Sequence, residues 1–334
     1  HDGTPAIAEL QRFLARERTS SEAERRAVLK AIKADVPDKK GRFRTPKRKE
    51  KVNRSDDFDW LEAMAGVGAT LPGLAEVKDD VAAIRALAAL RDPDAAAVLL
   101  DFGFSATGLI YRDECGRYLR RMDPYSLPAL IVASVDRQRD RSARRYAGYQ
   151  LDRLDREDPN KALAAARGDA PLELAVIRAY GQSKHRAAFA PLLALADAQS
   201  PGLRAAARTS LSAYVTGPEP RPAPKRKLVL PGGKLSDEEE PLWLNHRELA
   251  EVELRRAYQA AFDERPSRRM APSELAKALF SHYDRTREAR AETAYRDAEG
   301  QAQAGNWAEA TARYDRILAQ DPDHRKRPVA ARRY

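Results

Sequence analysis

One spacing of residues recurs five times between residues 80 and 211, and it constrains the fold more than any other feature of the chain. In each copy a polar or charged residue leads, a small or apolar residue follows three positions later, and an apolar or aromatic residue follows seven positions later. These spacings place the residues of one copy on the same side of an α-helix. The lead residues are Asp80, Arg112, Arg144, Glu173 and Arg204, at steps of 32, 32, 29 and 31 residues. The residues three positions later are Ala83, Cys115, Ala147, Val176 and Ala207, and those seven positions later are Leu87, Leu119, Leu151, Tyr180 and Leu211.

A second apolar helix is expected before each of these helices, and four of them stand out in the sequence. The clearest is AAFAPLLALADAQ at 187–199, and the other three are at 94–104, 124–137 and 158–167. A period near 30 residues that is built from helix pairs is the signature of an α-solenoid, in which each pair packs against its neighbours. The small residues let neighbouring helices approach, and the apolar residues fill the shared core. We therefore predict an all-α fold, with a small hairpin at KLVLPGGKL (227–235) as the one strand-like segment.

The last copy resembles a known repeat family. The run from Leu192 to Asp197, followed by the pair Leu203-Arg204 and then by Ala207 and Leu211, is similar to the HEAT-repeat pattern. In that pattern an apolar first helix ends in Asp, and the second helix carries a hydrophobe-Arg pair before small and leucine positions. The resemblance covers about residues 73–216, although Asp80 and Glu173 stand where Arg is usual. It implies an α-solenoid in which the lead residues Arg112, Arg144 and Arg204 connect adjacent repeats.

The segment 291–322 resembles one tetratricopeptide repeat. Its sequence, AETAYRDAEGQAQAGNWAEATARYDRILAQDP, departs from the family at Asp297, where an apolar residue is usual. The residues that follow, DPDHRKRPVAARRY, resemble the start of a next repeat, so we expect the repeat region 291–334 to be incomplete. The positions that match the family are Trp307, Ala310, Tyr314, Ile317 and Pro322.

Breaks in the helical pattern suggest the domain organisation. We predict a HEAT-like α-solenoid followed by a short helical segment, with helices near 242–263 and 272–290, and then a helix hairpin similar to a tetratricopeptide repeat. The predicted parts are an N-terminal helical pair (1–35), a basic linker (36–57), the solenoid (58–216), a Pro-rich and acidic linker (217–241), the helical segment (242–290) and the repeat (291–334).

The chain is basic, with 60 Lys and Arg against 50 Asp and Glu and a formal net charge of +10. Such a balance makes nucleic acid, an anionic membrane or an acidic protein conceivable partners, without choosing among them. The basic linker carries a single acid, Glu50, between Lys39 and Arg54. It is either a solvated tether or a strip that binds phosphates or acids, and its candidate contacts are Lys47, Arg48 and Lys49. The Ala and Arg bias of the chain is typical of a GC-rich bacterial genome.

Nothing in the sequence indicates catalysis, and we predict no catalytic, cofactor-binding or metal site and no cofactor. The single cysteine, Cys115, excludes an internal disulfide and a cysteine-based zinc site, and its place among the small positions predicts that it is buried and inert. The five histidines lack metal-ligand spacing, and phosphate-loop, dinucleotide and nucleophile-elbow motifs are missing. No apolar run approaches the roughly 20 residues that span a bilayer. We expect a cytoplasmic protein, with an envelope location left open.

These features favour a non-enzymatic scaffold for protein-protein interaction. A peptide or helix of the partner would lie in the solenoid groove, lined by Arg112, Arg144 and Arg204 or by their exposed neighbours Arg145 and Arg208. The alternative is nucleic-acid binding, because a subset of HEAT-like proteins, among them the HEAT-like alkylpurine DNA glycosylases, uses a basic groove on DNA. The strip 39–54 and the segment RQRDRSARR (137–145) motivate that alternative. The start at His1 and the abrupt end also suggest a piece of a longer protein or of a larger assembly.

Overall fold

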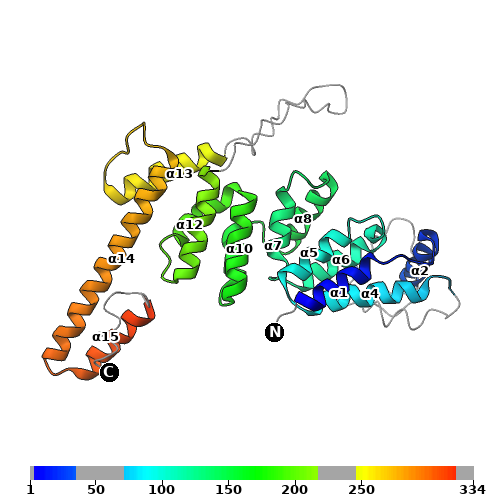
Figure 1. Cartoon of the computed structure of the whole chain (residues 1–334), viewed down its shortest axis with the longest axis horizontal. Helices are drawn as coiled ribbons and strands as arrows, with labels where there is room; N and C mark the ends of the chain where they lie inside the picture. Colours follow the sequence, from blue (N-terminus) through cyan, green and yellow to red (C-terminus); the bar gives the residue numbers. More distant parts are fainter. Residues whose placement is uncertain (1–3, 35–70, 217–245, 321–334) are drawn as a thin grey trace. The chain divides into compact units, whose positions relative to one another are not determined.

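The computed structural model describes residues 4–34, 71–216 and 246–320, and it divides into two compact units, His1–Glu157 and Asp158–Tyr334. Every regular element within the described ranges is helical, which confirms the prediction of an all-α fold there (Figure 1). The division after Glu157 falls inside the range 58–216 that the sequence analysis treats as one array. The predicted hairpin at 227–235 and both predicted linkers lie outside the described residues.

In the first unit, each helix packs against helices close to it in sequence. Helices α1 and α2 pack against α4, α5 packs against α4, α6 and α7, and α8 packs against α6 and α7. Asp92 and Asp140 accept backbone hydrogen bonds at the starts of α5 and α8, which is the ordinary way in which Asp begins a helix. The elements are α1 (Thr4–Ala15), α2 (Glu22–Ala34), α4 (Leu74–Ala89), α5 (Pro93–Phe102), the 3₁₀ turn η1 (Gly108–Tyr111), α6 (Arg112–Arg121), α7 (Leu127–Val135) and α8 (Arg141–Arg153).

The second unit has the same kind of local packing. Helix α10 contacts α9 and α12, α12 also contacts α11, α13 and α14, and α14 contacts α13 and α15. Asp158 and Asp169 cap α9 and α10. The elements are α9 (Pro159–Ala166), α10 (Ala170–Ser183), the 3₁₀ turn η2 (Arg186–Ala188), α11 (Phe189–Leu195), α12 (Pro201–Thr216), α13 (His246–Phe262), α14 (Pro272–Gln303) and α15 (Trp307–Gln320).

The core contains the periodic residues that the sequence singles out. All ten residues at the small and apolar positions are buried, on helices α4, α6, α8, α10 and α12. Cys115 is among them, and burial raises the pKa of its thiol well above the ordinary value. The predicted burial of these positions, and of Cys115 in particular, is therefore confirmed.

A buried ion cluster attaches the N-terminal helices to α4. Asp80, which stands at a lead position where Arg is usual, has a fully buried side chain. It accepts hydrogen bonds from Arg16 Nη1 at 2.9 Å and from Arg18 Nε and Nη2 at 3.1 Å. Glu76, one turn earlier, accepts hydrogen bonds from Ser20 and Thr19, and these lower its pKa to about 2. The acid at position 80 thus binds the turn between α1 and α2.

Helix α14 differs from the expected pattern. It runs without interruption from Pro272 to Gln303 and so crosses residue 290, where the sequence analysis expects one helix to end. The physical reason is that residues 284–303 contain no proline, and Ala, Arg and Glu, which favour the helix, predominate there. The segment therefore continues as one helix that packs on α13 near its start and on α15 near its end.

Candidate functional site

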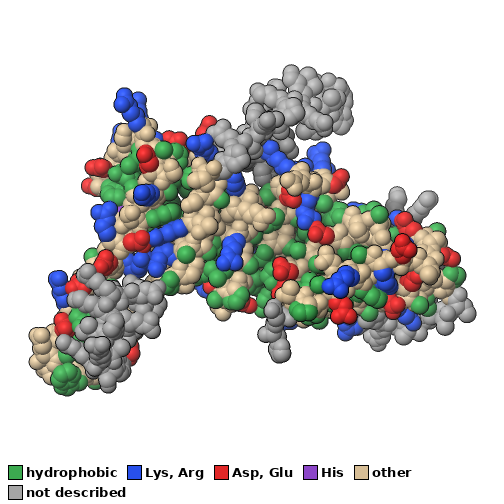
Figure 2. Space-filling view, viewed as in Figure 1, with side chains coloured by type: hydrophobic (Ala, Val, Ile, Leu, Met, Phe, Trp, Pro, Cys, Tyr) green, Lys and Arg blue, Asp and Glu red, His purple; other side chains and the backbone are tan. Residues whose placement is uncertain are grey.

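Helix α8 presents a row of exposed side chains on successive turns. Arg141, Arg145 and Tyr149 follow one another at intervals of four residues, and Asp152 lies eleven residues after Arg141, close to three full turns. All four side chains are exposed, and Tyr149 is 52% exposed. We call these four residues the α8 stripe. In the space-filling view, Lys and Arg side chains stand out around α8 with acidic side chains beside them (Figure 2).

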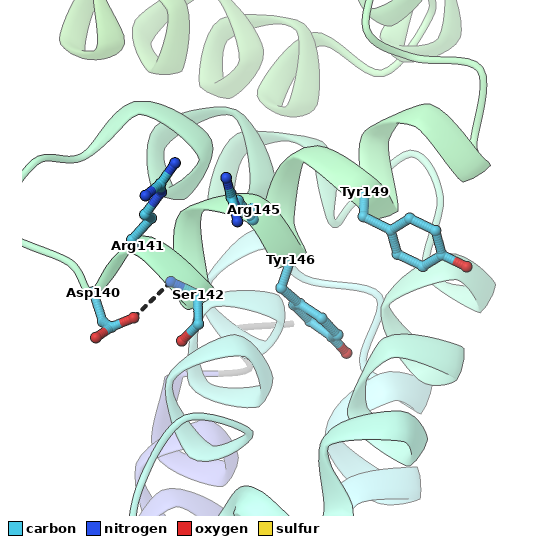
Figure 3. A pocket seen from close by; sticks show the side chains of 6 residues that line it. All are labelled: Asp140, Arg141, Ser142, Arg145, Tyr146 and Tyr149. Atoms are coloured by element: carbon cyan, nitrogen blue, oxygen red, sulfur yellow. Dashed lines mark hydrogen bonds between the residues drawn. The ribbon is translucent and has the colours of Figure 1, made fainter. Parts of the chain in front are cut away.

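An open hollow of about 540 Å³ adjoins the stripe. Figure 3 shows the side chains of Arg141 and Arg145 next to each other, with the two tyrosine rings directed away from them. Tyr146 is held firmly, because its hydroxyl donates to the carbonyl of Arg112 at 2.6 Å and its ring meets the edge of Phe104 at 5.2 Å. The residues that line the hollow are Asp140, Arg141, Ser142, Arg145, Tyr146 and Tyr149.

The charges of the stripe are largely available for a ligand. Within the described part of the chain, Arg141 and Arg145 take part in no hydrogen bond or ion pair. Arg153 lies over the Tyr149 ring, 6.0 Å from its centre, and donates to its hydroxyl at 3.4 Å. At the start of the helix, Ser142 lowers the pKa of the Asp140 carboxyl through its side chain and through its amide, which donates to that carboxyl. The stripe therefore offers two cations, an aromatic ring and a carboxylate in that order.

Of the candidate contact residues, Arg145 lies where the sequence analysis expects it, on an exposed helix face. Arg208 does not, and the expectation that it is exposed is wrong. Its side chain is 19% exposed and makes a bidentate ion pair with Asp284 of α14. Its Nε also donates to the carbonyl of Ala196 at 3.0 Å, and its guanidinium lies 5.1 Å from the centre of the Phe280 ring. This arginine joins α12 to α14 within the chain.

The lead arginines are half-buried and take different positions. Arg204 donates to the carbonyls of Ala198 and Gln199 at 2.8 and 3.1 Å, which lie in the turn that leads into its own helix. Arg112 lies over the ring of Phe104, 5.0 Å from its centre, and its carbonyl receives the Tyr146 hydroxyl. Arg144 is on α8, beside the stripe. The role of these arginines as connections between repeats stays a prediction.

The two aromatic residues of the C-terminal hairpin have opposite environments. Tyr314 is buried in the cluster that α14 and α15 share, and its ring centre is 5.6 Å from that of Tyr295. Trp307 is 68% exposed, so its side chain contributes little to this core. The other members of the cluster are Ala298, Ala302, Ala310 and Ile317.

Some predictions concern other parts of the molecule. The basic residues Lys47, Arg48 and Lys49 lie outside the described residues. Across residues 4–34, 71–216 and 246–320, no group of three or more His, Cys, Asp or Glu side chains is placed to hold a metal ion. None of the helices described combines the length and the apolar character that crossing a bilayer requires.

Of the four residues of the α8 stripe, the sequence predicts only Arg145 as a contact. Arg141 enters only as part of the basic segment 137–145, and Tyr149 and Asp152 are not among the predicted contacts. The sequence does contain a signal for the stripe, because four polar or amphipathic residues recur on one side of α8, opposite the buried Ala143 and Ala147.

Comparison of the chain with protein-family models, with curated protein sequences and with solved structures gave no match.

Proposed function

We propose that this chain is a non-enzymatic scaffold, or a subunit of a larger assembly, that binds another protein through the surface of a HEAT-like α-solenoid followed by a hairpin similar to a tetratricopeptide repeat. The burial of all ten periodic residues supports the repeat interpretation. So does the packing of α4, α6 and α8 in one unit and of α10 and α12 in the other, where the helices with the periodic residues contact each other. Arrays of this kind present extended surfaces to their partners.

The observation that carries the proposal is the α8 stripe. Two arginines that have no hydrogen bond or ion pair in the described part of the chain share a helix with a tyrosine that is 52% exposed, and the other face of that helix is buried. Tyr and Arg are the residue types that most often dominate the binding energy of protein interfaces. Tyr146 lines the adjacent hollow and is already held by Arg112 and Phe104, so a partner that contacts it would lose little free energy in ordering this side chain.

Site-specific photocrosslinking in the native host tests this function. A benzophenone amino acid replaces Tyr149 in one variant and Arg178 of α10 in a matched control. Arg178 is likewise exposed, and it has no ion pair or hydrogen bond in the described chain. We expect a discrete protein adduct from position 149, absent from position 178 and lost when Arg145→Glu is added. Equal adducts from both positions, or no protein adduct at position 149, would contradict the proposal.

The alternative function is nucleic-acid binding, favoured by the exposed arginines Arg137, Arg141 and Arg145 beside an exposed tyrosine. Arginine and aromatic side chains together bind single strands through phosphate contacts and base stacking. The test is a gel shift with single-stranded and duplex DNA at several salt concentrations. Binding that weakens steeply with salt and is lost in Arg141→Glu would support this function. No shift at low salt would remove it.

A further inference from the structure

We infer that the α8 stripe binds an acidic helical segment of a partner protein, in which two carboxylates one turn apart pair with Arg141 and Arg145. This inference rests on the proposed scaffold function and specifies the chemistry of the partner. The segment would also carry an apolar side chain one turn beyond the second carboxylate, against Tyr149, and a basic side chain opposite Asp152.

The spacing of the stripe matches a helix better than an extended chain. Four residues of α8 advance by about 6 Å, so the attachment points of Arg141, Arg145 and Tyr149 form a row with that repeat. A second helix that lies alongside α8 presents its own residues at the same repeat. Carboxylates one turn apart on that helix can therefore meet both guanidinium groups, and an Arg–carboxylate pair can form two parallel hydrogen bonds.

The order of charges favours a peptide with mixed charge over a nucleic acid. Tyr149 follows the two cations of the stripe, and Asp152 lies beyond it on the same side of α8, with the exposed Arg153 next to it and over the Tyr149 ring. Asp140, at the other end, accepts a hydrogen bond from the Ser142 amide, and contact with Ser142 lowers the pKa of its carboxyl. Duplex DNA carries one negative charge per about 1.7 Å of its axis, so a phosphate backbone that follows the stripe would meet carboxylates at both ends. A peptide helix can avoid this repulsion by carrying a basic residue opposite Asp152.

The tyrosines of α8 are the reason why the proposed partner segment carries an apolar side chain. Tyr149 and Tyr146 both line the hollow, Tyr149 exposed and Tyr146 held by the hydrogen bond from its hydroxyl to the carbonyl of Arg112. Gly148, one turn before Asp152 on α8, leaves open space where a Cβ would stand. A Leu or Met of the partner can pack on the exposed part of the Tyr149 ring beside Arg153, and this contact would bury apolar surface that water now covers.

Fluorescence anisotropy with designed peptides tests the inference directly. The first probe is a fluorescein-labelled, alanine-based helical peptide that carries Glu, Glu, Leu and Lys at the spacing of Arg141, Arg145, Tyr149 and Asp152. The second reads the same residues in reverse order, because the two helices can align in either direction. A third has the same composition in scrambled order, and labelled oligo-dT represents nucleic acid. The protein is the full chain at low and at physiological salt.

Charge-swap pairs give the decisive comparison. Arg145→Glu should weaken binding of the better matched peptide by about tenfold or more, and replacement of the facing Glu by Lys in the peptide should restore most of it. Asp152→Lys should likewise weaken binding of the better matched peptide, and replacement of the facing Lys by Glu in the peptide should restore most of that binding. Arg178→Glu makes the same change of net charge on α10 and serves as the control, which we expect to bind as the parent does.

Each other result overturns the inference. If the scrambled peptide binds as tightly as both matched ones, or if neither matched peptide binds, helical spacing is not what the stripe recognises. If Arg178→Glu weakens binding as much as Arg145→Glu, the attraction is only the net charge of the chain. If oligo-dT binds in an Arg141-dependent way and the peptides do not, the partner is a nucleic acid. A protein adduct at position 149 without any charge-swap rescue would leave the scaffold function standing and refute the acidic helix.

Discussion

Arg208 of α12 and Asp284 of α14 form a bidentate ion pair in which Nη1 and Nη2 each donate to a different carboxylate oxygen at 2.8 Å. Arg287, one turn along α14, donates to the same carboxylate at 2.8 Å. Arg208 and Asp284 are 76 residues apart in the chain, so the pair is a long-range link between α12 and α14. The hydrogen bonds from Arg208, and next those from Arg287, outweigh the effect of burial and lower the pKa of Asp284 to about 2.

Asp284→Asn should lower the free energy of unfolding near neutral pH by about 1 kcal/mol, a modest value because the carboxylate is 45% exposed and water screens it. A carboxylate whose pKa is lowered by folding stabilises the protein above its ordinary pKa of about 4, and this contribution disappears as the pH falls to about 2. Denaturant titrations between these pH values should therefore show the difference from the parent shrinking. Glu264→Gln, at an exposed acid of the loop after α13, is the control. A difference that does not change with pH would contradict the assignment.

Asp80→Asn should destabilise the first unit by about 3–5 kcal/mol, because it leaves Arg18, whose side chain is 4% exposed, without its buried anion. The neighbouring Asp79 is exposed, so Asp79→Asn should change the free energy of unfolding by less than about 0.5 kcal/mol. Denaturation followed by circular dichroism measures both variants. Limited proteolysis should also cut the α1–α2 segment sooner in Asp80→Asn. Similar stability of the two variants would show that the ion cluster does not hold these helices.

Gly181→Ala should destabilise the second unit by about 1–3 kcal/mol, although alanine favours a helix more than glycine does. A Cβ at this position of α10 would lie 2.8 Å from the Cα of Ser210 on α12, so the two helices would have to separate. At Gly148 of α8 a Cβ would meet nothing within 4 Å, and Gly148→Ala should be neutral or stabilising. Thermal melts of the two alanine variants distinguish these outcomes. A stable Gly181→Ala protein would mean that α10 and α12 do not cross so closely.

Trp307→Ala should leave stability within about 0.5 kcal/mol of the parent, because its side chain is 68% exposed. Tyr314→Ala removes a buried ring from the cluster of α14 and α15 and should cost about 3–5 kcal/mol in the stability of that hairpin. Hydrogen exchange of the α15 amides measures this local stability. A large loss of protection in Trp307→Ala would place the indole in the core, contrary to the structure.

The periodic residues were predictable from the sequence because burial on a helix follows its turn. Ala147 and Leu151, for example, lie four residues apart and are both buried on α8, as the spacing indicates. The partial burial of Arg208 and its ion pair with Asp284 were not predictable, because the two residues are 76 positions apart and no sequence pattern connects them. Arg204 and Arg208 are one turn apart on α12 and look equivalent in sequence, yet one binds a local turn and the other a distant helix. Only the packing of α12 on α14 separates them.

The exposed stripe on α8 illustrates a second limit. Sequence periodicity reveals which side of a helix is apolar, and therefore which side is left for solvent. It does not reveal which exposed charges are already paired within the chain. Arg139 binds Asp101, whereas Arg141, two residues later, has no such partner in the described chain, and this difference depends on the position of α5.

The uninterrupted helix α14 sets the spacing between two separate groups of buried side chains. Its 32 residues span about 48 Å, with Leu275 and Leu279 buried near its start and Tyr295 and Ala298 buried near its end. The ion pair at Asp284 lies between these two groups. Because an intact helix rises by a fixed amount per residue, the length of α14 determines how far the core shared with α15 lies from Asp284, about 30 Å at the end of the helix.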